Sequence, residues 1–239
     1  MNRILLESSE IDEDRAVLTG ERARHVLDVL HGEVGQVIKT GEVNGKIGQS
    51  EIVKISNAEP GKEELHLRVT HDKEGLKPWC DLILAPPRPR AMKRLLPQLA
   101  SLGVERIVLV GAKKVEKDFW GATLLKEENY RPLFITGLMQ SGTSILPTLS
   151  FRRNFRKFLT EEIDETFPFG RRIVAHPYGA NDNLSADTKE RLLLAVGPEG
   201  GWTEEEVELL ECKGFMRYSL GERILRTDTA LIALLSRFM

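Results

Sequence analysis

The chain has 239 residues, of which 41% are hydrophobic and 29% are charged, and its formal net charge is −2. This composition is typical of a globular protein with one large domain or with a small and a medium domain. No apolar run approaches the ~20 residues that are needed to cross a membrane, and the N-terminus lacks the apolar stretch of a signal peptide. We therefore expect a cytoplasmic protein that does not contact the membrane.

The cysteines and histidines do not form a recognisable site. Cys80 and Cys212 are isolated and have no CxxC spacing, which argues against a structural disulfide and for a reducing compartment. The five histidines show no HExxH motif or other paired spacing. The sequence therefore predicts no metal site.

The charge is unevenly distributed along the chain. Residues 81–160 carry 14 Lys and Arg against 6 Asp and Glu, a net charge of +8, whereas the segments on either side are acidic. Such clustering is typical of proteins that bind a phosphate backbone, although a solvated basic face gives the same pattern. The clustered basic residues are Arg88, Arg90, Lys93, Arg94, Lys113, Lys114, Lys117, Arg152, Arg153, Arg156 and Lys157.

The first 70 residues predict a mostly β structure with one short helix. Apolar residues at 23, 26, 27 and 30 form a helical stripe over residues 21–30. Short alternating runs that are broken by glycine follow at 36–39, 45–48, 51–55 and 65–69. Strands of this length at roughly ten-residue spacing indicate a small barrel. The polar segment 71–78 ends in proline and predicts a linker.

From residue 79 onward, strands alternate with helices. The pattern predicts strands over 81–85, 106–110, 173–176 and 192–196, and helices over 92–102, 209–213 and 229–237. An acidic helix is expected to begin after Thr203, which is a suitable N-cap residue. Alternation of this kind predicts a parallel α/β sheet, whose ligands usually bind at the carboxyl ends of the strands.

Two glycine-containing segments are the most informative part of the sequence. The first, VGPEGGWT at 196–203, follows a buried strand and leads into the acidic helix. Such a turn can bind a polar ligand through backbone N–H groups, although an ordinary tight turn has a similar sequence. The second, LGERILRTDTA at 220–230, places Arg223 and Arg226 about one helical turn apart. Together the two segments favour a binding site.

Several enzyme classes are excluded because their motifs are missing. No GxGxxG follows a strand, and no GxSxG is present. Residues 41–46 are one residue short of a P-loop and lack the following Ser or Thr. What remains is a glycine-lined pocket at the strand ends with arginine and carboxylate side chains.

Segments 193–201 and 220–230 resemble the two C-terminal signatures of the uracil-N3 methyltransferases of small-subunit (16S) rRNA, a SPOUT-class family. Weaker matches lie at 102–104, 140–142, 175–177 and around His25. The resemblance implies an N-terminal PUA-like β-barrel over 1–72 and a C-terminal SPOUT α/β domain with a trefoil knot over 73–239. It also implies an S-adenosylmethionine-dependent RNA methyltransferase that forms a homodimer and acts on rRNA, within the small ribosomal subunit.

The chain departs from this family's pattern at six positions, which are Asp28, His31, Gln98, Ser101, Met139 and Thr143. The segments that resemble cofactor loops are kept, whereas we expect the departures to fall on positions that face RNA. Two other functions therefore stay open: methylation of a different RNA, such as tRNA, and RNA binding without catalysis.

The candidate catalytic residues are Arg226, Arg223 and Glu199. A guanidinium group is permanently charged and bidentate, so it suits a uridine anion or a phosphate, although either arginine could form a structural ion pair with Glu222 or Asp228. The carboxylate of Glu199 either holds the turn or faces the ligand. The predicted cofactor-binding residues are Ala175, His176, Val196, Gly197, Pro198, Glu199, Gly200, Gly201, Leu220, Gly221, Ile224, Leu225, Arg226 and Thr229. The predicted RNA-binding residues are Arg3, Arg22, His25, Arg88, Arg90, Lys93, Lys113 and Lys117.

Overall fold

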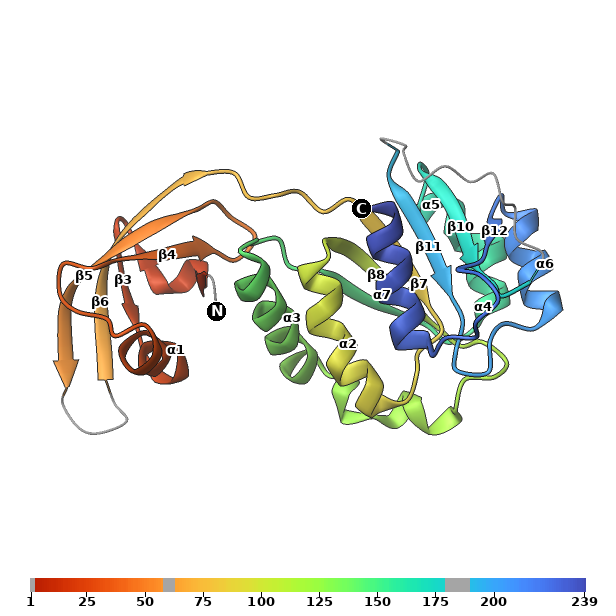
Figure 1. Cartoon of the computed structure of the whole chain (residues 1–239), viewed down its shortest axis with the longest axis horizontal. Coiled ribbons are helices and arrows are strands. Elements are labelled where there is room, and N and C mark those ends of the chain that lie inside the picture. The colour runs from red at the N-terminus through yellow and green to blue at the C-terminus, as the bar shows by residue number, and fades with distance from the viewer. Residues whose placement is uncertain (1–2, 58–62, 179–189) are drawn as a thin grey trace. The chain divides into compact units, whose positions relative to one another are not determined.

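The computed structural model describes residues 3–57, 63–178 and 190–239 (Figure 1). The chain forms two compact units, Met1–Lys77 with Ile135–Leu146, and Pro78–Phe134 with Pro147–Met239. The domain boundaries 1–72 and 73–239 stay a prediction. The structure adds that segment 135–146 belongs to the first unit. Among the described residues, no helix combines the length and the apolar character that a membrane span requires.

The first unit is built on a curled mixed sheet with strand order β1-β4-β5-β6-β3-β2. β1 is parallel to β4, and the other neighbouring strands are antiparallel. Within the described residues the sheet stays open, so the predicted small barrel is a half-barrel. Its strands are β1 (Ile4–Leu6), β2 (Ile11–Asp12), β3 (Arg15–Leu18), β4 (Val37–Glu42), β5 (Ile47–Asn57) and β6 (Glu63–Lys73).

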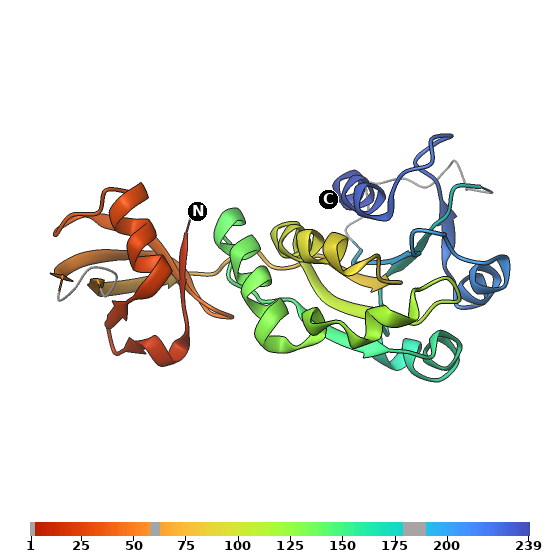
Figure 2. The ribbon, with the colours of Figure 1, turned by 90° about the horizontal axis from the view of Figure 1, so that it is seen from below.

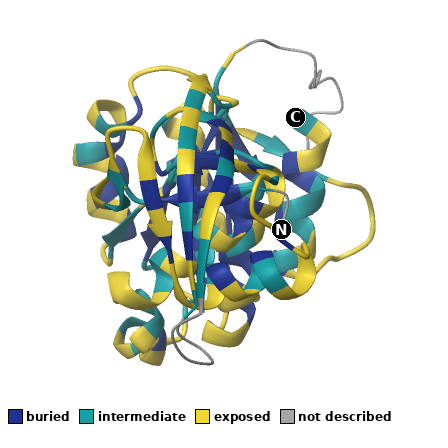
Figure 3. Cartoon of the chain, turned by 90° about the vertical axis from the view of Figure 1, so that its left-hand side faces the viewer, coloured by how far each residue is buried: buried dark blue, intermediate teal, exposed yellow. Residues whose placement is uncertain are grey.

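One face of this sheet is apolar. Buried residues alternate with exposed ones along β3 and the first part of β4 (Figure 3). Helix α1 (Gly20–Arg24) continues into a π-helical turn over His25–Val29, and both follow the apolar stripe that predicted a helix here. Ala23 and Val26 on this stripe are fully buried. A 3-10 turn over Ser8–Glu10 lies between β1 and β2.

The two long strands of the first unit correct the sequence analysis. β5 and β6 each run for 11 residues, whereas shorter strands and a linker from residue 71 were expected. Gly48 lies inside β5, at a point where the pairing with β6 is irregular, and it does not interrupt the strand. A Cβ atom at this position would lie 2.0 Å from the carbonyl oxygen of Thr70. Gly48 therefore permits a close approach of two backbones inside a continuous strand.

The second unit confirms the predicted parallel α/β sheet. Its strand order is β12-β10-β11-β7-β8-β9, and all neighbouring strands are parallel. The central strands β7 and β11 are buried along their whole length, as is typical of sheets with helices on both faces. The strands are β7 (Cys80–Leu84), β8 (Val104–Val110), β9 (Thr148–Arg152), β10 (Arg171–Ala175), β11 (Leu192–Val196) and β12 (Met216–Tyr218).

Helices cover both faces of this sheet. Figure 2 shows α2 and α7 on one face and the helical segments around α4 and α6 on the other. α2 packs against α7, while Val207 and Leu210 of α6 pack with Ile83 and Leu193 of the sheet. The helices of this unit are α2 (Pro89–Ser101), α4 (Phe155–Lys157), α5 (Ile163–Thr166), α6 (Glu204–Cys212) and α7 (Thr227–Phe238), with 3-10 turns at Lys117–Gly121 and Thr123–Leu125 and a π-helical turn at Phe158–Glu162. Helix α3 (Glu127–Ser141) begins in this unit, and its residues from Ile135 onward belong to the first unit. The trefoil knot stays a prediction.

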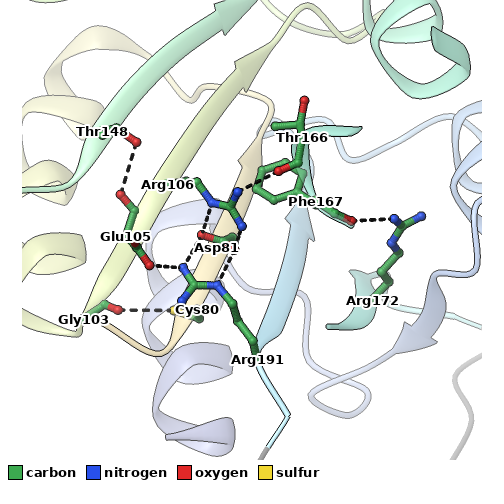
Figure 4. A network of polar contacts seen from close by, with 10 residues as sticks. All are labelled: Cys80, Asp81, Gly103, Glu105, Arg106, Thr148, Thr166, Phe167, Arg172 and Arg191. Carbon is green, nitrogen blue, oxygen red and sulfur yellow. Dashed lines mark hydrogen bonds and ion pairs between the residues drawn. The ribbon is translucent and has the colours of Figure 1, made fainter. Parts of the chain in front are cut away.

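A charged network holds the amino ends of the central strands together (Figure 4). Asp81 on β7 is 1% exposed. Its carboxylate accepts hydrogen bonds from Arg106 at 3.0 and 2.6 Å and from Arg191 at 2.6 and 2.7 Å. Arg191 also pairs with Glu105, and Arg106 donates to the carbonyl oxygen of Thr166 at 2.7 Å. Because β7, β8 and β11 begin at this network, it fixes the end of the sheet opposite the glycine turns.

Both cysteines are free thiols. Cys80 is buried at the start of β7, and burial together with the neighbouring Asp81 raises the pKa of its thiol. Cys212 is exposed at the end of α6. No disulfide joins these two residues, as the sequence predicts.

Candidate functional site

A pocket of about 350 Å³ lies at the carboxyl ends of β10, β11 and β12 in the second unit. Its volume falls in the range of small-molecule sites, and its position is the one expected for a parallel sheet. Its lining combines glycine turns, apolar and aromatic side chains, and several charged or hydroxyl-bearing residues. It is lined by Lys114, Ala175, His176, Pro177, Tyr178, Val196, Gly197, Pro198, Glu199, Gly200, Gly201, Trp202, Tyr218, Ser219, Leu220, Gly221, Arg223, Ile224, Leu225, Thr227, Ala230 and Leu234.

The turn over residues 197–201 forms one wall of the pocket. It begins where the buried strand β11 ends at Val196. A Cβ atom on Gly197 would lie 3.0 Å from the backbone nitrogen of Trp202, so a larger residue would displace the turn. Gly201 has φ +68° and donates its N–H to the carbonyl oxygen of Pro198 at 2.8 Å. Both positions require glycine because the backbone is tightly folded here.

The side chain of Glu206 ties this turn to the loop after β8. One carboxylate oxygen accepts the N–H of Thr203, the N-cap residue of α6, at 2.8 Å, and the other accepts the N–H of Lys113 at 2.8 Å. Next to it, Lys114 Nζ donates to the carbonyl oxygen of Gly200 at 2.7 Å. The glycine turn, the start of α6 and the loop after β8 are therefore connected at the pocket.

The turn over residues 219–226 forms the opposite wall. Ser219 Oγ donates to the carbonyl oxygen of Pro177 and accepts the N–H of Gly221, at 3.2 and 3.1 Å. Gly221 has φ +109°, a conformation that favours glycine. Thr227 Oγ1, at the start of α7, donates to the carbonyl oxygen of Gly197 at 3.4 Å. The two glycine segments, which are separated by about twenty residues, are thus joined in one site.

Residues 75–239 match the family described as "RNA methyltransferase domain". The chain belongs to this family. The ribosomal RNA small subunit methyltransferase E of Treponema pallidum is 30% identical to it over 240 residues, which cover 98% of the chain and 88% of the relative.

Two solved structures share the fold of this RNA methyltransferase. A protein from Legionella pneumophila whose structure holds the bound cofactor SAM has a TM-score of 0.77 and 23% identity, covering 99% of this chain and 96% of its own. The ribosomal RNA small subunit methyltransferase E of Neisseria gonorrhoeae, bound to S-adenosyl methionine, has a TM-score of 0.73 and 24% identity, covering 99% and 95%. The predicted combination of a curled N-terminal β-sheet with a parallel α/β domain is therefore correct.

The pocket of the RNA methyltransferase contains most of the residues that were predicted to bind a cofactor. All of them except Arg226 and Thr229 line it. The pocket is also lined by residues that the sequence did not predict to bind a cofactor, namely Lys114, Pro177, Tyr178, Trp202, Tyr218, Ser219, Thr227, Ala230 and Leu234. Trp202, Thr227 and Ala230 lie within or next to the two glycine segments, so their sequence neighbourhood could have suggested them. Lys114 lies in the loop after β8, far in the sequence from both glycine segments, so no neighbouring motif suggested it.

The three predicted catalytic residues occupy different positions. Arg223 lines the pocket, whereas the side chain of Arg226 lies outside the lining and is 72% exposed. Glu199 lines the pocket, and its carboxylate lies 3.5 Å from Arg88 Nε. The alternative of a structural ion pair is weak for Arg226, since its Nε is 3.9 Å from Asp228 and both groups meet solvent. The catalytic roles stay predictions.

The two arginines of the first unit that were predicted to bind RNA are engaged within that unit. Arg3 donates to the carbonyl oxygens of Thr40, Gly48 and Gly142 at 2.5, 2.8 and 3.1 Å. Arg22 pairs with Glu10. His25 Nε2 is buried and has no hydrogen-bond partner among the described residues, and burial lowers the pKa of this histidine.

The corresponding residues of the second unit are exposed. Arg90 and Lys93 lie on α2, while Lys113 and Lys117 lie near the loop after β8. Arg88 is exposed as well but pairs with Glu116 at 2.9 Å. Among the predicted RNA-binding residues, those of the second unit are therefore more exposed than those of the first unit. RNA contact by any of them stays a prediction.

Met139 corrects the expectation that all departures from the family pattern face RNA. Its side chain is 4% exposed, and its carbonyl oxygen accepts the N–H of Arg3 at 3.1 Å. The segment around it packs within the first unit, which explains why an apolar residue is suitable there. Asp28, His31 and Gln98 are exposed, whereas Ser101 and Thr143 are half-buried.

Proposed function

We propose that the protein uses S-adenosylmethionine to methylate N3 of a uridine in 16S rRNA of the small ribosomal subunit. The observation that carries this proposal is the pocket at the strand ends, which both glycine segments line. The name of the Treponema pallidum relative and the cofactor in the two solved structures support the same function.

The residues of the pocket fit this cofactor. Apolar and aromatic side chains, among them Tyr218, Ile224 and Leu225, suit the faces of an adenosyl group. The tight turns at Gly197 and Gly221 keep side chains out of the cradle and leave backbone groups for polar contacts. When bound, S-adenosylmethionine supplies an electrophilic methyl group on a sulfonium sulfur. The turns 197–201 and 219–226 would hold it.

The side chains at the rim supply the remaining chemistry. Uridine N3 carries a proton at neutral pH, so the reaction needs a group that accepts this proton or stabilises the uridine anion. Glu199 is suited to accept the proton, because it lines the pocket and carries a carboxylate. Arg226 and Arg223 are suited to stabilise the anion or to clamp a phosphate, since a guanidinium keeps its charge at all relevant pH values.

A homodimer is part of the proposal. Leu220, Ile224 and Leu225 are exposed at the rim of the pocket. The lone chain thus leaves an apolar group of side chains uncovered beside its ligand site, and a second copy is suited to cover them. Helix α7, which carries apolar residues on several sides, borders the same pocket through Ala230 and Leu234.

The test is methyl transfer to small ribosomal subunits from a strain that lacks the gene. Purified protein with radiolabelled S-adenosylmethionine should transfer one methyl group per subunit, and digestion of the rRNA should yield N3-methyluridine. Subunits that already carry the modification are the matched control and should accept none. A methyl group on another nucleoside, or on tRNA only, would contradict the proposed substrate. Absence of any transfer together with absence of cofactor binding in calorimetry would contradict the proposed activity.

A further inference from the structure

A second pocket, of about 320 Å³, adjoins the first one. It lies between the loop after β7, the loop after β8 and the turn 197–201, all within the second unit. It shares Lys114, Pro198, Glu199 and Gly200 with the first pocket. Of these, Lys114, Glu199 and Gly200 are exposed, so both pockets open to the same surface.

The topology of the sheet makes this position a natural ligand site. β7 and β11 are adjacent and parallel, yet the chain leaves them in opposite directions. β7 leads through α2 to β8 on one side, and β11 leads through α6 to β12 on the other. The loops after two such strands diverge to opposite faces and leave a crevice, where open α/β sheets bind their ligands.

The walls of the second pocket combine an apolar floor with a charged rim. Pro86, Pro87 and Phe119 line it and are buried. The rim carries two cationic donors, Arg88 and Lys114, and the two carboxylates of Glu116 and Glu199.

The charged groups of the rim satisfy one another in the structure. Arg88 Nε is 2.9 Å from Glu116 and 3.5 Å from Glu199, and these side chains are 67%, 56% and 36% exposed. Lys114 Nζ donates to the carbonyl oxygen of Gly200 at 2.7 Å. Exposed pairs of this kind contribute little stability, so a ligand with complementary groups can replace them.

We propose that this second pocket receives the acceptor base, a uracil that has left its stack. Enzymes that modify a base take it out of the helix into a pocket that contacts its faces and its Watson–Crick edge. That edge of uracil offers O4 and O2 as acceptors on either side of the N3–H donor. Arg88 and Lys114 are suited to donate to the carbonyl oxygens, and Glu116 or Glu199 to accept from N3–H. This inference rests on the proposed methyl transfer to a uridine.

The two carboxylates argue against a phosphate as the occupant. A phosphodiester of the RNA backbone has no hydrogen to donate to these carboxylates, and its negative charge would be repelled by Glu116 and Glu199. A base with a neutral N–H donor tolerates them and gains a hydrogen bond to a charged acceptor. The apolar floor also suits the face of a base better than it suits a phosphate.

The experiment measures small probes against the full-length protein saturated with S-adenosylhomocysteine. Binding of uridine 5′-monophosphate, cytidine 5′-monophosphate and ribose 5-phosphate is followed by ligand-observed NMR. Uridine 5′-monophosphate should bind best, because the cytosine edge has no donor at N3 and ribose 5-phosphate has no base. Arg88→Ala and Glu116→Gln should each weaken the uridine probe by about tenfold, the worth of one hydrogen bond to a charged group.

The controls separate this inference from the fold and from the proposed function. Lys126→Ala removes an exposed charge that lines neither pocket and should leave probe binding unchanged. Thermal unfolding and cofactor affinity should stay at wild-type values in all three variants, since the substituted side chains are exposed. Equal binding of ribose 5-phosphate and the uridine probe, or undiminished binding in both pocket variants, overturns the inference. If the protein binds the uridine probe selectively but small subunits accept no methyl group, the rRNA substrate fails and the base pocket stands.

Discussion

At the scale of single residues, carboxylates have different environments and roles at the two ends of the parallel sheet. Asp81 is buried at the amino ends with two arginines. Burial alone would raise its pKa, but the hydrogen bonds and charges of Arg191 and Arg106 outweigh burial and hold the pKa below its ordinary value. Glu116 and Glu199, at the carboxyl ends, are exposed and share one partner, Arg88. The charges at the amino ends therefore stabilise the fold, whereas those at the carboxyl ends are accessible to a ligand.

Asp81→Asn should destabilise the fold because it leaves the two arginines without their shared partner. We expect a loss of about 3 kcal/mol in the free energy of unfolding, measured by urea titration at pH 7. Asp164→Asn is the matched control. It removes a carboxylate that is 60% exposed and paired with Arg172 and Lys213, and it should cost less than about 1 kcal/mol.

The same variant carries a pH prediction. Because the pKa of Asp81 is lower in the folded chain than in the unfolded chain, its contribution is present above about pH 4 and is lost as the pH falls through the folded-state pKa. The difference in stability between wild type and Asp81→Asn should therefore be largest near neutral pH and shrink towards pH 3. A difference that grows on acidification would contradict the assignment.

Arg226→Ala tests the arginine outside the pocket lining. The side chain is exposed and does not line the pocket, so its loss should change cofactor affinity by no more than a few-fold. We expect kcat/KM for small subunits to fall by about 100-fold, the usual cost of one group that stabilises charge in the transition state. Arg226→Lys, which keeps the charge but not the bidentate geometry, should recover part of this loss. Cofactor affinity that falls as much as the rate would instead place Arg226 in the cofactor site.

At the scale of elements, the sequence predicted what local patterns determine. The apolar runs 81–85 and 192–196 became β7 and β11, and the glycine segments became pocket walls, since short strands and turns have local signals. Helix α3 was missed because Pro132 lies inside it and its apolar residues do not favour one side. Lys114 was missed because its place in the pocket depends on strand order. Strand order is set by packing across the whole sheet, which no local pattern reports.

Glu206→Ala tests how one side chain couples two elements. Its carboxylate bonds the N-cap residue of α6 and the loop after β8 at once. Loss of both bonds should lower the free energy of unfolding by about 1–2 kcal/mol. Cofactor affinity should also weaken, because the loop that carries Lys114 loses its anchor. Glu208→Ala, at an exposed position of the same helix, should change neither quantity.

At the scale of the whole molecule, the proposed homodimer is open to direct measurement. The chain has a mass of 27.0 kDa, so light scattering at micromolar concentration should give about twice this value. Ile224→Glu places a charge among the exposed apolar residues at the pocket rim and should shift the distribution towards the monomer. If wild type scatters as a monomer throughout, the rim residues need another explanation, such as contact with the RNA.

The distribution of charge along the chain leads to a second prediction at this scale. The net charge of +8 over residues 81–160 coexists with a negative total, so RNA binding should depend on a few placed cations. The slope of log K against log salt measures how many phosphates these cations contact. Lys93→Ala with Lys117→Ala should reduce this slope by roughly 1.4–1.8 for the pair, because each lost phosphate contact removes somewhat less than one unit. Lys126→Ala should leave it unchanged. A slope that is the same in all variants would mean that neither lysine contacts a phosphate, and that the basic segment is only solvated.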